Sequence, residues 1–205
     1  ATGAYFTFIS RTFYIIAHPL AFVKGLCYNN IGYFVNNFLG VREMQDHIFV
    51  LLMQTGTSVA KVLQFFTRKP YNHASVALDL TLEEMYSFCR NHIHFPLPAG
   101  FNQEIVGEGT LGRFLVIPCE IYAIPVTKEK KQEFEQNLEY FKNHRSMFSY
   151  NVLGLGTTFL RIRWSRKHKL HCSQFVATLL AQSGVRLNKP LSLHTPDDLR
   201  YISDA

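Results

Sequence analysis

One cysteine and one histidine, about a hundred residues apart, are the residues of this chain best suited to covalent chemistry. Cys172 lies in the segment His-Cys-Ser-Gln-Phe-Val, and His73 begins the segment His-Ala-Ser-Val-Ala-Leu-Asp-Leu. A thiol becomes a good nucleophile when a neighbouring base and a positive environment stabilise its thiolate. The pair therefore predicts a nucleophilic cysteine that a histidine activates.

Cys172 falls at the expected start of a helix. Residues 172–182 carry apolar side chains at helical spacing and are followed by Ser183-Gly184, a typical helix end. The free amides and partial positive charge of a helix N-terminus lower a thiol pKa, and they can also stabilise an oxyanion. Because Cys172 also lies on or beside the apolar stripe, a buried structural cysteine is the alternative interpretation.

His73 falls at the expected start of a strand. Residues 73–80 alternate, with Ala74, Val76, Leu78 and Leu80 on one face. His73 lies on the opposite face, where its imidazole is free to contact another group. The alternative is a hydrogen-bonded surface histidine.

The elements that must position these residues indicate a mixed α+β chain with an antiparallel sheet. Pro96, Pro98 and Gly100 mark a loop, and the Gly-containing stretch 146–160 is expected to be another. Thr127 is the expected N-cap of one helix, and Thr195-Pro-Asp-Asp has the chemistry of a second helix start. The remaining expected elements are strands at 47–54, 73–80, 85–88, 104–106 and 114–126 and helices at 58–66 and 172–182.

The N-terminal residues 1–46 differ in composition from the rest of the chain. They are apolar and aromatic, and the first acidic residues appear near Val41 to His47. The longest clean apolar run, 12–17, is far short of the roughly 20 residues that a spanning helix needs, and the stretch lacks the regions of a signal peptide. We therefore expect an aromatic-rich helical extension over 1–46, followed by one domain over 47–205. An interfacial membrane helix is the alternative.

Bulk composition excludes several classes of protein. A hydrophobic content of 47% with 18% charged residues excludes a disordered chain. Four cysteines without CxxC spacing predict reduced thiols and a cytoplasmic protein, with membrane association as the alternative. No metal-ligand spacing is present, since His92 and His94 have no nearby third ligand, so no metal is expected.

A basic segment, 161–169, directly precedes Cys172. It reads Arg-Ile-Arg-Trp-Ser-Arg-Lys-His-Lys. A solvated loop is one interpretation, and recognition of an anionic substrate or lipid head group, with Trp164 as an interfacial anchor, is the other. Nucleic acid is not an expected partner, because no recognisable binding module surrounds the segment.

Several motifs, taken in order, resemble the circularly permuted papain-like cysteine hydrolases. This NlpC-type superfamily includes a YiiX-like branch and relatives of lecithin retinol acyltransferase. The resemblance covers roughly residues 47–200 and leaves the N-terminal segment unexplained. The matching segments are 47–57, 71–79, Tyr150-Asn-Val-Leu-Gly, 171–176 and 195–199.

The resemblance implies a papain-like antiparallel sheet packed against helices and assigns roles to four residues. Cys172 matches the nucleophile and His73 the general base. Tyr150 matches a tyrosine that helps the backbone amide of the cysteine to form the oxyanion hole, although a buried structural tyrosine is the alternative. Ser87 lies where relatives carry a polar residue that orients the imidazole, and Glu104 is a competing candidate. No metal or organic cofactor is implied.

Three functions follow as expectations. The first is a cysteine hydrolase that cleaves an amide bond, in a peptide or cell-wall-type peptide, through an acyl-enzyme. The second keeps the nucleophile and acts on a lipid acyl ester or thioester, as a hydrolase or acyltransferase at a membrane surface. The third is a binding domain that keeps the fold without turnover.

Overall fold

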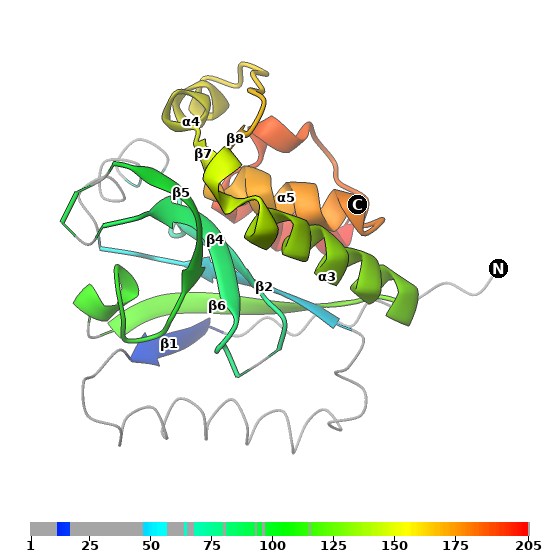
Figure 1. Cartoon of the computed structure of the whole chain (residues 1–205), viewed down its shortest axis with the longest axis horizontal. Helices are drawn as coiled ribbons and strands as arrows, with labels where there is room; N and C mark the ends of the chain where they lie inside the picture. Colours follow the sequence, from blue (N-terminus) through cyan, green and yellow to red (C-terminus); the bar gives the residue numbers. More distant parts are fainter. Residues whose placement is uncertain are drawn as a thin grey trace.

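The computed structural model describes residues 12–16, 47–56, 64, 68–79, 81–92, 94–95, 97–114 and 116–204 of this 205-residue chain, with the backbone alone at 12–16, 203 and 204. These residues contain a six-stranded sheet in which every neighbouring pair is antiparallel (Figure 1). The expected α+β class and antiparallel sheet are therefore confirmed. Across the sheet the order is β1 (Thr12–Ile16), β6 (Val116–Pro125), β2 (His47–Met53), β3 (His73–Ala77), β4 (Met85–Arg90) and β5 (Ala99–Glu104).

Strand β2 is continuously apolar from Ile48 to Met53 because it is buried on both faces. Ile48, Val50 and Leu52 belong to the core on one side of the sheet. Phe49 and Met53, which point the other way, belong to a second core. A strand that is buried on both sides carries a continuous apolar run instead of an alternating one.

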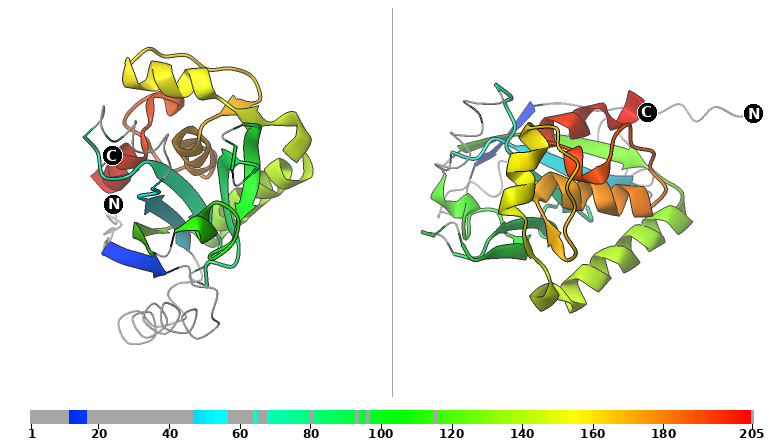
Figure 2. Two further views of the ribbon diagram at one scale, coloured as in Figure 1. Left: turned by 90° about the vertical axis from the view of Figure 1, so that its left-hand side faces the viewer. Right: turned by 90° about the horizontal axis from the view of Figure 1, so that it is seen from above.

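Two helices cover one face of the sheet, α3 (Lys128–Asn143) and α5 (Cys172–Gln182) (Figures 1 and 2). The predicted cap of α3 is confirmed, since the Thr127 side chain accepts a hydrogen bond from the Lys130 amide. Nearly every residue of α5 is buried, and this helix packs on β3 and β4. The N-terminus of α5 therefore lies against the strand that His73 begins.

Short elements near the C-terminus complete the surroundings of that helix start. β7 (Ser149–Tyr150) pairs in parallel with β8 (Lys169–Leu170), and α4 (Val152–Phe159) lies between them in the chain. At Thr195 the amide donates to the Asp198 carboxylate and the threonine hydroxyl accepts from the Asp198 amide, so the predicted helix-start chemistry is confirmed. The 3-10 turns are η2 (Leu111–Arg113), η3 (Arg145–Met147), η4 (Leu191–Leu193) and η5 (Pro196–Asp204).

Two sequence expectations about local structure were wrong because glycine was taken as a sign of a loop. The stretch 146–160 contains helix α4, which needs Gly154 because a Cβ there would lie 2.0 Å from the Asn151 side chain that caps the helix. The strand expected at 104–106 runs instead over 99–104. It needs Gly100, where a Cβ would lie 3.0 Å from the Phe148 carbonyl oxygen.

The helical extension expected over 1–46 is wrong for residues 12–16. These residues form the edge strand β1 and pair with β6, so they belong to the same sheet as the domain. The rest of 1–46 and most of the helix expected at 58–66 lie outside the described residues. Within the described ranges, no helix is both long enough and apolar enough to cross a bilayer.

Candidate active site

Four segments that are distant in sequence bring Cys172, His73, Glu104 and Tyr150 together. Cys172 is the first residue of α5, His73 the first of β3, and Glu104 the last of β5. Tyr150 ends β7 and pairs with Leu170 of β8, and Leu170 lies two residues before the start of α5. Each residue thus lies at the end of an element, where the backbone is fixed while the side chain is free to point into the site.

The imidazole of His73 is held by the carboxylate of Glu104. His73 Nε2 lies 2.9 Å from Glu104 Oε1 and 3.1 Å from Oε2. The Ser75 hydroxyl donates to the same carboxylate over 2.5 Å. Only 4% of the Glu104 side chain is exposed against 12% of the His73 side chain, so the imidazole is the more accessible member of the pair.

The second nitrogen of His73 is left to interact with the cysteine. The side chains of His73 and Cys172 lie close enough for each to shift the pKa of the other. Because Nε2 is engaged by Glu104, the ring nitrogen available to the thiol is Nδ1. The arrangement is a relay of carboxylate, imidazole and thiol, which orients the ring and stabilises its charged form.

Cys172 and His73 are poised as an ion pair. Burial disfavours the Cys172 thiolate, but the hydrogen bond and charge of His73, with the amides of Ala74 and Ser173, outweigh burial and lower the pKa of Cys172. Burial likewise disfavours the imidazolium of His73, but the charge of Glu104 and the contacts with Cys172 and Glu104 raise its pKa. Both shifts favour a thiolate beside an imidazolium near neutral pH, which is the reactive form of a cysteine nucleophile.

The Tyr150 hydroxyl lies against the same cysteine. Its pKa is raised by burial and by the negative charge of the Cys172 thiolate, so the phenol stays protonated as a donor. It contacts both the Cys172 side chain and the Cys172 backbone amide. Two donors, the phenol and that amide, therefore flank the position where an oxyanion would develop.

Ser87 does not contact the imidazole as its predicted role requires. Its side chain is fully buried on β4 and lies close enough to Glu104 to help lower the pKa of that carboxyl. Among the described residues, however, its hydroxyl makes no well-formed hydrogen bond. Glu104, the competing candidate, makes the contact with the His73 imidazole that was predicted for Ser87.

His171 belongs to the scaffold of the site. It is the N-cap of α5, and its Nδ1 accepts from the Gln174 amide at 3.2 Å. The neutral ring therefore carries its proton on Nε2, which lies 3.2 Å from Thr158 Oγ1. Burial lowers the pKa of His171 to about 4, so the ring stays neutral and does not compete with His73 for the Cys172 proton.

Sequence reasoning did not single out Ser75 or Thr158. Ser75 could have been found, because the alternation of 73–80 places it on the same face as His73, two residues along. Thr158 gives no such signal: its role depends on α4, which the sequence did not predict. The structure places no metal cluster here either, since no three His, Cys, Asp or Glu residues of the described segments are arranged to hold an ion.

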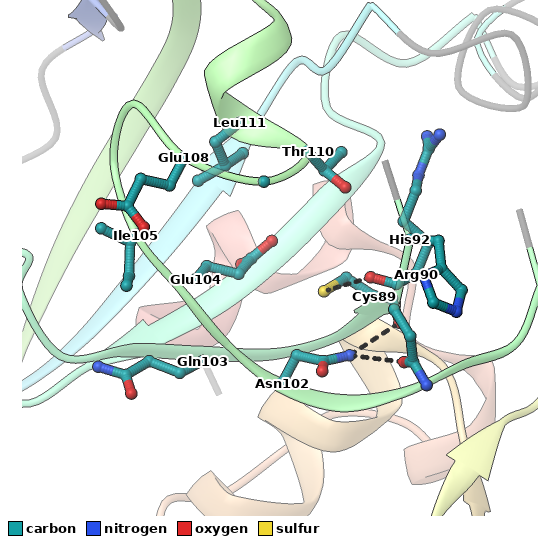
Figure 3. Close-up of a pocket in the computed structure, with 12 residues that line it drawn as sticks. Cys89, Arg90, His92, Asn102, Gln103, Glu104, Ile105, Glu108, Thr110 and Leu111 are labelled. Carbon is teal, nitrogen blue, oxygen red and sulfur yellow. Dashed lines mark hydrogen bonds between the residues drawn. The ribbon is translucent and has the colours of Figure 1, made fainter. Parts of the chain in front are cut away.

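A pocket of about 190 Å³ lies on the β4–β5 side of the site, and Glu104 forms part of its wall (Figure 3). Most of its lining is polar. Cys89, on the same wall, has its pKa raised by burial and by the charge of Glu104, so its thiol stays protonated, whereas the pKa of Cys172 is lowered. The polar lining includes Arg90, Asn91, His92, Asn102, Gln103, Glu108 and Thr110.

No known protein family, curated protein or solved structure matches the chain. The function is therefore inferred from the geometry of the site.

Proposed function

We propose that the protein is a cysteine hydrolase of the papain-like kind that cleaves an amide bond through an acyl-enzyme. The observation that carries the proposal is the position of the Cys172 thiol at a helix N-terminus between His73 and Tyr150, with Glu104 behind the imidazole. The strand that carries the histidine precedes the helix that carries the cysteine in the chain, which is the order of the permuted papain-like proteins.

The first half of the reaction follows from this arrangement. The Cys172 thiolate attacks the carbonyl carbon, and the carbonyl electron pair moves onto oxygen. The Tyr150 hydroxyl and the Cys172 amide donate to that oxyanion. The His73 imidazolium then gives its proton to the departing amine as the carbon–nitrogen bond breaks, which leaves a thioester on Cys172.

The second half restores the enzyme. Neutral His73 takes a proton from water as the water oxygen attacks the thioester carbonyl, and the same two donors hold the second oxyanion. When this intermediate collapses, the carbon–sulfur bond breaks and Cys172 leaves as a thiolate beside the imidazolium. While His73 is protonated, its charge and hydrogen bond, with the hydrogen bond of Ser75, outweigh burial and lower the pKa of Glu104, which favours the carboxylate beside the imidazolium.

An amide in a polar substrate, such as a peptide, is the leading substrate class. It is supported by the polar residues that line the pocket beside Glu104, although Cys172, His73 and Tyr150 are not among the residues of that lining. A lipid acyl ester or thioester is the second candidate. The observation in its favour is the exposed apolar and basic surface between Tyr150 and Cys172, which includes Leu160, Ile162 and Trp164.

Selective labelling tests the nucleophile directly. The protein is treated near neutral pH with a limiting amount of an acylating thiol probe, and each cysteine is quantified by mass spectrometry. We expect Cys172 to react at least about tenfold faster than Cys89 or Cys119, since His73 stabilises the Cys172 thiolate. Equal rates at the three thiols would contradict the proposal and favour a binding domain without turnover.

Substrate class is tested on the same preparation. Peptide amides and phospholipid acyl esters are assayed side by side with the wild type and with Cys172→Ala. Hydrolysis of the amides alone, abolished in the variant, supports the leading class. Hydrolysis of the esters alone would replace it by the second candidate.

A further inference from the structure

Helix α4 turns its apolar residues toward solvent. Its exposed positions are Val152, Leu153 and Gly156, and Leu160 directly follows on the same face. Leu153 is 60% exposed and Leu160 71%. The buried side of the helix carries Gly154 and Thr158 instead. A helix in contact with water normally shows the opposite pattern, so this face is built to meet something other than water.

The loop after α4 continues the same surface. Ile162 and Trp164 are exposed, so five of the twelve exposed large hydrophobic side chains of the described residues fall between 152 and 164. This concentration within thirteen residues distinguishes a surface from scattered apolar exposure. Figures 1 and 2 show α4 and this loop at one end of the molecule, beyond the start of α5.

Cations are interleaved with these apolar residues. The loop carries Arg161, Arg163, Arg166, Lys167 and Lys169, and none of the five forms an ion pair with a described acidic residue. The chain has nine Lys or Arg and no Asp or Glu from 140 to 196. The basic charge here is therefore not balanced by local acids and remains available to an anionic partner.

Arg161 occupies a position where arginine is conformationally unfavourable. Its φ is 57°, in the left-handed region, and it ends α4 in a Schellman arrangement: its amide donates to the Thr158 carbonyl at 3.1 Å and the Ile162 amide to the Thr157 carbonyl at 2.9 Å. Glycine is the favoured residue at this position, because it has no Cβ to clash. Arg161→Gly therefore offers a way to remove this cation and relieve the backbone at the same time.

We propose that residues 152–169, the α4–β8 surface, dock the protein on an anionic lipid membrane. Basic side chains between exposed leucine, isoleucine and tryptophan match the negative head groups and the acyl region beneath them. A nucleic acid would use the cations but not the leucines, and a second copy of the chain would bring the same positive charge. The surface joins Tyr150 to Cys172 along the chain, so docking places the candidate active site beside the bilayer. The docking itself does not depend on the proposed hydrolase activity.

Sedimentation with vesicles tests the proposal on the full chain. Vesicles of phosphatidylcholine alone are compared with vesicles that also contain phosphatidylglycerol, at low and at high salt. We expect binding that requires phosphatidylglycerol, weakens with salt, and falls about 25-fold in Arg161→Gln/Arg163→Gln, at roughly fivefold for each cation. The charge-matched control is Lys128→Gln/Lys130→Gln, in the first turn of α3 at the far end of that helix from α4, and it retains binding (Figure 1).

Two further variants separate membrane docking from simple charge attraction. Leu153→Ser/Leu160→Ser is expected to lose at least about tenfold in vesicle binding through lost apolar contact, whereas Val116→Ser, exposed to 49% on β6, is not. Arg161→Gly is expected to raise the urea midpoint, because glycine adopts the left-handed backbone conformation at this position without strain. The same variant should bind vesicles about fivefold more weakly, because it removes one cation.

Three outcomes overturn the proposal. They are equal binding to both vesicle types, full binding by the Leu153→Ser/Leu160→Ser variant, and binding to duplex DNA that matches or exceeds binding to the vesicles. Cys172→Ala keeps vesicle binding if the proposal is right, whatever its activity. If the wild-type protein does not bind the vesicles but its Cys172 still reacts selectively with the thiol probe, the docking surface is rejected and the proposed hydrolase is not affected.

Discussion

At the scale of single residues, the function of Glu104 can be separated from that of Ser87. Glu104 contacts His73 Nε2 through both carboxylate oxygens, whereas Ser87 only lies beside Glu104. Glu104→Gln removes the charge that raises the pKa of His73. The ion pair exists above the lowered pKa of Cys172 and below the raised pKa of His73, so the variant narrows this pH range from its alkaline side.

We expect Glu104→Gln to reduce kcat by at least about 10²-fold, since it weakens both the orientation and the charge of the base. The alkaline limit of kcat/KM, above which His73 has lost the proton that the departing amine needs, should move to lower pH, which a merely structural role would not cause. Ser87→Ala is the matched comparison and should stay within about twofold of wild type. A larger loss in Ser87→Ala than in Glu104→Gln would return the orienting role to Ser87.

Tyr150 contacts both the thiol and the backbone amide of Cys172, so two functions can be distinguished for its hydroxyl. If it stabilises the oxyanion, Tyr150→Phe lowers kcat by about 10²–10³-fold and leaves KM little changed. The rate of Cys172 alkylation should stay near that of wild type, because His73 still stabilises the thiolate. A parallel fall in alkylation would show instead that the phenol serves the thiol.

At the scale of elements, the two glycines of α4 have opposite requirements. A Cβ at Gly154 would lie 2.0 Å from the Asn151 side chain, but a Cβ at Gly156 would meet nothing within 4 Å. Gly154→Ala should destabilise the protein by about 1–3 kcal/mol, because it displaces the buried cap. Gly156→Ala should stabilise it by about 0.5–1 kcal/mol, because alanine loses less backbone entropy in a helix.

Urea unfolding of both alanine variants measures this difference, and activity provides a second readout. Asn151 directly follows Tyr150, so a displaced cap in Gly154→Ala should also lower kcat. Equal stability changes of the same sign in the two variants would show that α4 does not require the cap as described.

The same helix shows what the sequence can and cannot predict. The segments 47–53 and 172–182 were predicted because one is continuously apolar and the other combines helical spacing with a clear end. Helix α4 and strand β5 were not, because Gly154 and Gly100 resemble loop signals until the side chain or carbonyl that excludes a Cβ is known. Likewise, Cys172 and His73 could be proposed from local pattern, whereas the contact of Glu104 with His73 depends on how β5 pairs with β4, which in turn pairs with β3.

At the scale of the whole molecule, helices on one face of the sheet build the core, and the candidate active site lies where one of these helices begins. Helices α3 and α5 build an aromatic core with β4 and β5, in which Phe88, Phe101 and Phe175 are in mutual ring contact. That core fixes the axis of α5, and so the position of Cys172 at its start. The network of His171 and Thr158 then ties the same helix end to α4. The stability of the protein and the proposed catalysis therefore both depend on the N-terminus of α5.

Two buried histidines, His171 and His194, make the stability of the whole protein sensitive to mild acid. An unfolded histidine has its usual pKa of 6.5, whereas burial lowers that of His171 to about 4 and also lowers that of His194. The unfolded chain therefore binds more protons, and stability falls as pH drops from 6.5 toward 4. For His171 alone, the free energy of unfolding falls by about 3 kcal/mol once the pH is below both the unfolded and the folded pKa.

Urea unfolding at pH 7, 6 and 5 should show this loss in the wild type. His171→Asn keeps an acceptor for the Gln174 amide at the N-cap but carries no titrating group. The variant should start from lower stability at pH 7, because the contact of Nε2 with Thr158 is lost, and its stability should then decline less steeply with acid. An identical decline in the variant and the wild type would mean that His171 has the same pKa in the folded protein as in the unfolded chain. That result would contradict the conclusion that His171 caps α5 as a neutral imidazole.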